Sequence, residues 1–98
     1  MEVRFADVRL DRLETDRRYD AGFSQTVVKA FRKRMQLIRS ALDERVFYQL
    51  KSLHFEKMEG DRSHQHSLRL NDQWRLIIEF ARSVPNKVVV VVSIEDYH

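Results

Sequence analysis

The last three residues of this 98-residue chain are titratable side chains that can take up or release a proton. Asp96, Tyr97 and His98 come directly after the apolar run VVVVVSI and Glu95. The ordinary pKa of an imidazole is about 6.5, so His98 is the best candidate for a general acid or base near neutral pH. Asp96 could orient a neighbouring imidazole, and Tyr97 could donate a hydrogen bond. The cluster therefore predicts proton-transfer chemistry, with a solvated polar tail as the alternative.

Metal-dependent chemistry is not what the remaining residues predict. The chain has four histidines and no cysteine. His64 and His66 flank a single residue, and no histidine pair has the spacing of a zinc-binding motif. We therefore expect neither a metal nor a cofactor. The absence of cysteine also fits a reducing compartment, and no apolar stretch is long enough to span a membrane or to act as a signal peptide, so we expect a cytoplasmic protein with no membrane partner.

The elements that must position the terminal cluster can be read from the hydrophobic period. Ser24 is a candidate N-cap for an amphipathic helix whose apolar positions recur from Val27 to Leu42. A short strand is expected at 3–5, a short helix at 7–16, and a looser helical turn near 47–53. After Gly60 the period becomes extended, which predicts strands at 66–70, 74–80 and 87–94, with turns at 71–73 and 81–86.

This order predicts a single α+β domain over residues 1–98, with helices in the first half packed on an antiparallel meander. Val88 to Val92 is apolar on both faces, which is typical of a strand in the interior of a sheet. Asp96, Tyr97 and His98 would then lie at the end of a central strand, where a site is held rigidly. Since side chains alternate along a strand, Asp96 and His98 are expected on one face and Tyr97 on the other.

Positive charge is concentrated in one part of the chain. The net charge is +3, and residues 21–60 carry eight basic and four acidic side chains, whereas residues 1–20 carry five basic and six acidic ones. A local basic surface suits a polyanion, and it suits an acidic protein equally well.

One combination of motifs is much more specific than any single feature above. The long helix is followed by FEKMEGDRSHQHSLRLNDQWRLIIEF and then by a valine-rich strand that closes on EDYH. From about Gly22 to His98 this pattern resembles the HigB-type toxins, or proteic killer proteins, of the RelE/ParE superfamily. The resemblance implies a RelE-like α+β fold, in which two helices pack on one face of an antiparallel sheet. It also implies the toxin of a type II toxin–antitoxin system that cleaves mRNA on the ribosome without a metal. The implied partners are a HigA-like helix-turn-helix antitoxin, the 70S ribosome and mRNA.

RNA cleavage without a metal needs a base for the 2′-hydroxyl, cations for the phosphorane and an acid for the leaving 5′-oxygen. In the family the terminal DYH is catalytic, which assigns these roles to Asp96, Tyr97 and His98. Arg75 matches the arginine of the family's WR pair, and its planar cation suits the phosphorane. His54 matches a histidine that some relatives place in the site, although packing is an equal alternative.

Other residues are candidates for binding phosphate or RNA. These are Lys57, Arg62, Arg32, Lys33 and Trp74. For the two helical residues the alternative is an ordinary solvated helix face, and for the tryptophan it is the core. Many relatives have a lysine directly before GDR, where this chain has Glu59. If Lys57 cannot reach the site, an arginine must supply more of the positive charge.

Two other functions remain open from the sequence. A ParE-like branch of the superfamily inhibits DNA gyrase and has no nuclease chemistry. A decayed toxin could retain antitoxin binding alone, and Glu59 keeps that alternative open. The terminal DYH favours the nuclease, because a gyrase inhibitor needs no proton-transfer cluster.

Overall fold

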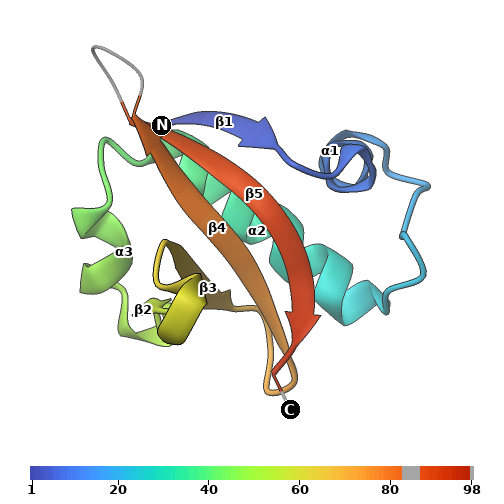
Figure 1. Ribbon diagram of the computed structural model, residues 1–98. Coiled ribbons are helices and arrows are strands. Elements are labelled where there is room, and N and C mark those ends of the chain that lie inside the picture. Colours follow the sequence, from blue (N-terminus) through green and yellow to red (C-terminus); the bar gives the residue numbers. More distant parts are fainter. Residues whose placement is uncertain (83–86, 98) are drawn as a thin grey trace.

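The computed structural model describes residues 1–82 and 87–97 of the chain. His98 and part of the predicted turn at 81–86 lie outside these residues. Within them, the chain forms one five-stranded sheet with the helices packed on it (Figure 1).

The helices come from the first half of the chain, as predicted. They are α1 (Val8–Thr15), α2 (Gln25–Ser40) and α3 (Arg45–Gln49), followed by the short 3-10 helices η1 (Lys51–Leu53) and η2 (Gly60–Arg62). Ser24 caps α2, because its hydroxyl oxygen accepts the N–H of Val27 at 3.3 Å. The helix ends at Ser40, whereas the apolar pattern in the sequence continues to Leu42. Leu42 lies beyond the helix and is 94% exposed.

The sheet is mixed, whereas the sequence predicted an antiparallel one. Its strands are β1 (Glu2–Phe5), β2 (Glu56–Lys57), β3 (Gln65–Arg69), β4 (Trp74–Arg82) and β5 (Lys87–Asp96), in the order β1-β5-β4-β3-β2. The pairs from β2 to β5 are antiparallel, and β1 runs parallel to β5. A four-residue strand carries no pattern that reveals the direction of its partner. The predicted α+β class is confirmed.

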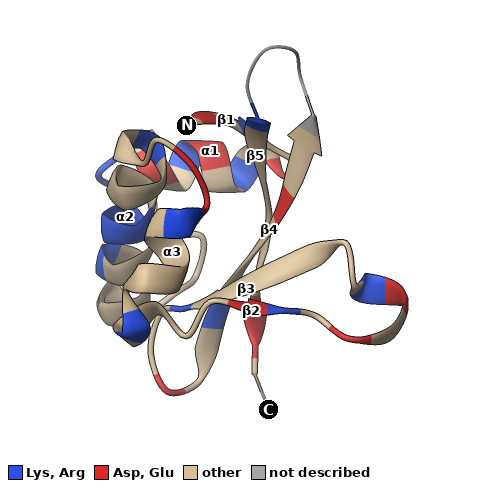
Figure 2. Ribbon diagram, turned by 90° about the vertical axis from the view of Figure 1, so that its left-hand side faces the viewer, with Lys and Arg blue, Asp and Glu red and all other residues tan. Residues whose placement is uncertain are grey.

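The helices cover one face of the sheet (Figure 2). Phe31, Met35 and Ile38 of α2 are fully buried, as are Val89 and Val91 of β5. β5 lies between β1 and β4, which confirms that the valine-rich strand is internal. Burial of apolar area on both sides of this strand stabilises the position at which the chain emerges toward Tyr97.

The opposite face carries several polar side chains beside the buried Ile77 and Val88, because residues alternate along each strand. We call it the polar face; it presents Gln65, Ser67, Arg75, Glu79 and Glu95. Most of these polar side chains form hydrogen bonds or ion pairs with one another or with Arg62 of η2. Gln65 donates to Glu79 at 2.8 Å, and its amide oxygen accepts from Arg62 of η2. Arg62 also forms a two-pronged ion pair with Glu95, at 2.8 and 2.7 Å, which lowers the pKa of that carboxyl.

Candidate active site

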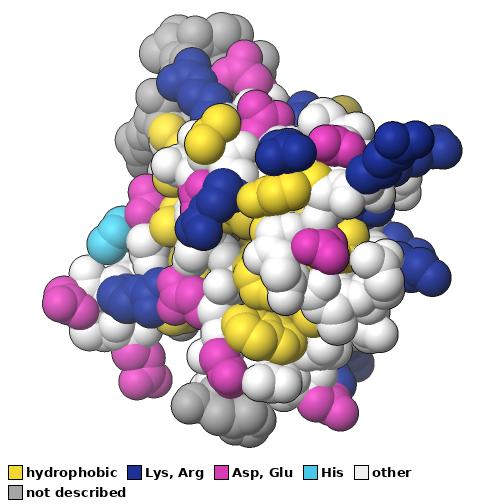
Figure 3. All heavy atoms as spheres, turned by 90° about the vertical axis from the view of Figure 1, so that its right-hand side faces the viewer, with side chains coloured by type: hydrophobic (Ala, Val, Ile, Leu, Met, Phe, Trp, Pro, Cys, Tyr) yellow, Lys and Arg dark blue, Asp and Glu magenta, His cyan; other side chains and the backbone are white. Residues whose placement is uncertain are grey.

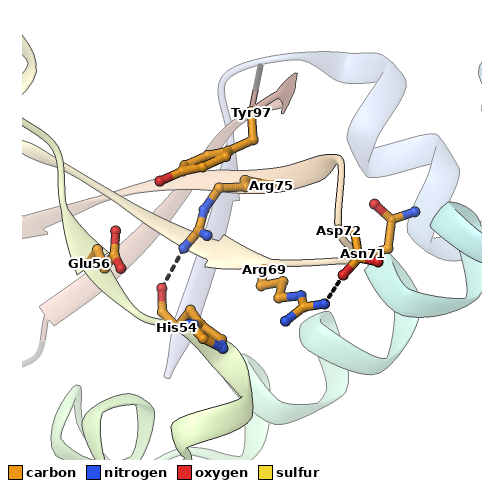
Figure 4. Close-up of a pocket in the computed structure, with 7 residues that line it drawn as sticks. All are labelled: His54, Glu56, Arg69, Asn71, Asp72, Arg75 and Tyr97. Carbon is orange, nitrogen blue, oxygen red and sulfur yellow. Dashed lines mark hydrogen bonds and ion pairs between the residues drawn. The ribbon is translucent and has the colours of Figure 1, made fainter.

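A hollow of about 230 Å³ opens at the end of the polar face where β5 ends. Figure 4 shows the side chains that surround it. They come from the end of η1, from β2, from β3 and β4 with the turn between them, and from the residue after β5. The lining residues are His54, Glu56, Arg69, Asn71, Asp72, Arg75 and Tyr97. The structure thus brings together three of the five predicted catalytic residues.

Arg75 forms the floor of the hollow and is only 8% exposed. Its Nε donates to the hydroxyl of Ser67 at 2.9 Å, and its Nη2 donates to the backbone carbonyl of His54. The guanidinium carbon lies 5.0 Å from the centre of the Tyr97 ring, which covers it (Figure 4). These hydrogen-bond acceptors are all uncharged, so they fix the guanidinium in place without neutralising it.

Tyr97 and Asp96 lie on opposite faces of the sheet. Asp96 is paired with Trp74, whose ring packs against Phe23 on the helix side at 5.4 Å, whereas Tyr97 stands over Arg75 on the polar face. Asp96 accepts a hydrogen bond from the side chain of Gln73 at 2.9 Å. The structure therefore brings Tyr97 into the hollow and leaves Asp96 outside it. The predicted role of His98 concerns a residue outside those described.

His54 has a backbone conformation that is rare for a residue with a side chain. Its φ of 45° and ψ of 50° lie in the left-handed region, where it ends η1. Such a conformation costs about 1–2 kcal/mol for most L-residues and occurs often at functional sites. Here it places both groups of the residue at the hollow, since the carbonyl holds Arg75 and the imidazole lines the wall.

Glu56 is a lining residue that the sequence analysis missed. It is the partner of Ser67 in the β2–β3 pair, so its carboxylate shares the polar face with Arg75. Within the described part of the chain, this exposed carboxylate makes no hydrogen bond or ion pair. The alternation of Glu56 and Lys57 could have revealed it, but a two-residue strand is too short to be recognised from its period.

Lys57 does not reach the hollow, because it alternates with Glu56. It is paired with His66, which packs on the helix side among aromatic rings. The positive charge at the hollow comes instead from Arg75 and from Arg69, a second residue that the sequence analysis did not select.

Residues 3–98 match the family model of the RelE-like toxin HigB of type II toxin–antitoxin systems. The chain belongs to this HigB-like toxin family. It is therefore a type II toxin, and a type II toxin has an antitoxin as its partner. Among curated protein sequences, none matches the chain.

The fold is shared with a solved toxin of low sequence identity. The HigB-like chain is similar to the YoeB/ParE toxin from Agrobacterium tumefaciens, with a TM-score of 0.62 and 18% identity over 100% of both chains. This likeness confirms the predicted RelE-like architecture, and at such identity it concerns the fold alone.

The other predicted RNA-binding residues of the HigB-like chain have mixed surroundings. Trp74 is half-buried against Phe23 and contributes to the core. Lys33 is exposed, whereas Arg32 is half-buried and donates to the backbone carbonyls of three residues. Arg62 is paired with Glu95 next to Arg75. A role of these residues in RNA binding stays a prediction.

Among residues 1–82 and 87–97, no group of three or more histidine, cysteine and acidic side chains is placed to hold a metal ion. None of the helices in the same residues is long and apolar enough to cross a membrane.

Proposed function

We propose that this HigB-like toxin is a ribosome-dependent mRNA endonuclease that needs no metal. One observation carries the proposal. The buried guanidinium of Arg75 has only uncharged hydrogen-bond acceptors among the described residues, and it faces an open hollow whose walls also hold proton acceptors, His54 and Glu56. A cation fixed in advance at the place where charge develops is the main requirement for stabilising a phosphorane.

The reaction would use the substrate's own 2′-hydroxyl. A base takes the proton of that hydroxyl, and its oxygen attacks the adjacent phosphorus to form a phosphorane stabilised by Arg75. The bond to the 5′-oxygen then breaks, and an acid donates a proton to that oxygen. The products are a 2′,3′-cyclic phosphate and a free 5′-hydroxyl, so the proton count balances.

The described residues offer two candidates for the base. Both the imidazole of His54 and the carboxylate of Glu56 line the hollow with Arg75. His98 remains the sequence-based candidate for the acid. Tyr97, whose ring covers the cation, would donate its hydroxyl proton to a phosphate oxygen or stack on a base.

The test maps new 5′ ends of mRNA after brief induction of the wild type and of Arg75→Gln. We expect ends within reading frames for the wild type, and a fall of about 10²–10³-fold for the variant, as on loss of one charge-stabilising donor. An unchanged melting temperature of the variant would show that the loss is catalytic. Growth arrest by the wild type without new ends would contradict the nuclease and favour a gyrase-inhibiting toxin, which a supercoiling assay would detect. Neither arrest nor cleavage would indicate a decayed toxin.

Ser67 gives a sharper prediction, because it accepts a hydrogen bond from Arg75 and is not among the residues that line the hollow. Ser67→Ala removes the acceptor of Nε and leaves a buried donor unsatisfied, a cost of about 1–3 kcal/mol. We expect cleavage to fall about tenfold in kcat for ribosome-bound message, with KM little changed. Ser67→Thr keeps the hydroxyl and should retain most activity. Equal kcat in Ser67→Ala and the wild type would show that the hydroxyl does not position Arg75.

The proposed partners follow from family membership. A HigA-like antitoxin with a helix-turn-helix domain would neutralise the toxin, and co-expression of the adjacent reading frame should restore growth. The ribosome would be contacted by the exposed basic side chains of α2, which include Lys29 and Lys33 (Figure 2). On the face shown in Figure 3, by contrast, acidic and basic side chains are interspersed around apolar atoms. That face therefore presents no continuous positive surface to RNA.

A further inference from the structure

Two arginines face each other across strands at the edge of the hollow. Arg69 of β3 and Arg75 of β4 are direct partners in the antiparallel register, so both side chains project from the polar face. Directly opposite residues have Cβ atoms about 4.5–5.5 Å apart, and like charges in such a pair are destabilising. A stable sheet that keeps this pair must place negative charge nearby.

A third guanidinium adds to this concentration of charge. Nε of Arg34 in α2 donates to the backbone carbonyl of Arg69 at 2.9 Å. Its pKa is lowered first by burial and then by the positive charge of Arg69. The electrostatic potential around Arg69 therefore favours an anion. The guanidinium groups of Arg34 and Arg69 destabilise each other by their closeness.

Asp72 supplies the negative charge in the free protein. Its carboxylate pairs with Nη2 of Arg69, as Figure 4 shows, and both residues line the hollow. The Asp72 side chain is nevertheless 94% exposed, and it lies in the turn between β3 and β4. An ion pair with such an exposed partner is weak, about 0.2–1 kcal/mol, so a phosphate can replace the carboxylate at little cost.

We propose that Arg69 is a second phosphate-binding residue, which takes the phosphate next to the one at Arg75, and that Asp72 occupies this subsite until RNA displaces it. The inference rests on the proposed function, since it assumes that the hollow receives an RNA strand. Arg69 and Arg75 would bind successive phosphates of one single strand. Asp72 would act as an internal competitor that weakens the binding of any anion to the free toxin.

The experiment measures binding of a short single-stranded RNA with a 2′-deoxy nucleotide at the cleavage position, so that no product forms. Asp72→Asn should bind about 2–5-fold more tightly than the wild type, which is the factor that an exposed ion pair represents. Asp11→Asn is the matched control, because it removes an equal charge from an exposed position in α1.

The Arg69→Gln variant tests whether the tighter RNA binding of Asp72→Asn depends on Arg69. In an Arg69→Gln background, Asp72→Asn should give no further tightening. The inference is overturned if Asp72→Asn behaves like Asp11→Asn, if its gain persists without Arg69, or if neither the wild type nor Asp72→Asn binds the oligonucleotide. Circular dichroism should show that each variant keeps its fold, as expected for a turn residue as exposed as Asp72.

Failure of the inference can be told apart from failure of the proposed function. Cleavage by the wild type with no effect of Asp72→Asn on RNA binding would remove the subsite alone. Binding that follows the predicted pattern, with no cleavage on ribosomes, would remove the nuclease and leave an RNA-binding hollow.

Discussion

Arg75 is buried, and its hydrogen-bond partners among the described residues are neutral. In the register of the sheet it lies opposite Glu95, but that carboxylate is taken by Arg62 and Ser93. A buried cation without a carboxylate partner is costly for stability. Such an arrangement is typical of a site where the missing negative charge arrives with the ligand. The ion pair of Arg62 and Glu95 thus serves the site by leaving Arg75 uncompensated.

A second residue-scale feature is the imidazole of His66. It is stacked on Phe55, with ring centres 4.9 Å apart, and within the described residues its Nδ1 is buried without a hydrogen-bond partner. Burial lowers the pKa of His66; Glu44 opposes this shift, and Lys57 adds to it. The unfolded chain, with a histidine pKa of about 6.5, then takes up the proton first as the pH falls. The contribution of His66 to stability is complete above that pH and is lost as the pH falls toward the lowered folded-state pKa.

We therefore predict that the melting temperature falls between pH 7 and pH 5, and that His66→Phe makes this fall smaller by about 2–4 °C. Phenylalanine keeps the stacking on Phe55 and removes the titration. The other histidines are present in both proteins, so the difference between the two curves belongs to His66. Parallel curves over this range would show that His66 does not limit stability in acid.

At the scale of elements, the side chain of Arg32 helps to fasten α2 to the segment before it. Arg32 donates to the carbonyls of Leu13 and Asp16 at 3.0 Å and to that of Tyr19 at 3.3 Å. The first two carbonyls belong to the end of α1, where a cation is favoured by the helix dipole. Arg32 thus closes the connection between α1 and α2, and its neighbour Lys33 is exposed to solvent.

This difference predicts opposite behaviour for two adjacent cations. Arg32→Gln should lower the free energy of unfolding by about 1.5–3 kcal/mol, because charged hydrogen bonds to backbone carbonyls are lost. Lys33→Gln removes the same charge from an exposed position and should change stability by less than about 0.5 kcal/mol. Urea denaturation of the two variants measures both values. Equal stabilities would mean that the carbonyls of the connection are satisfied equally well by water.

The helices and strands were largely predictable from local patterns in the sequence. The amphipathic run identified α2, the alternation identified β3, and the valine run identified β5 and its internal position. The direction of β1 was missed because its partner lies at the other end of the chain. Glu56 and Arg69 were missed for a related reason. They lie opposite Ser67 and Arg75 only because of the register of the strands, which the sequence alone does not give. The residue types near the site were therefore predictable, while their shared face required the pairing of distant segments.

For the whole molecule, the two positive regions lie on different sides of the sheet. Arg69 and Arg75 project from the polar face, whereas Lys29 and Lys33 are exposed on α2, which packs against the other face. A protein with a net charge of only +3 gains little from its overall charge in binding a polyanion. Association with a ribosome would depend instead on where these local charges lie.

The contribution of α2 can be measured separately from catalysis in an Arg75→Gln background, which prevents cleavage. Lys29→Glu with Lys33→Glu should weaken co-sedimentation with 70S ribosomes by at least about tenfold at low salt, and the loss should shrink as salt rises. Arg17→Glu with Arg18→Glu is the matched control, since these exposed residues precede α2 and give the same change in net charge. An equal loss in both pairs would assign ribosome affinity to overall charge. No loss in either pair would show that α2 faces away from ribosomal RNA, and contact would then fall to the polar face around the hollow.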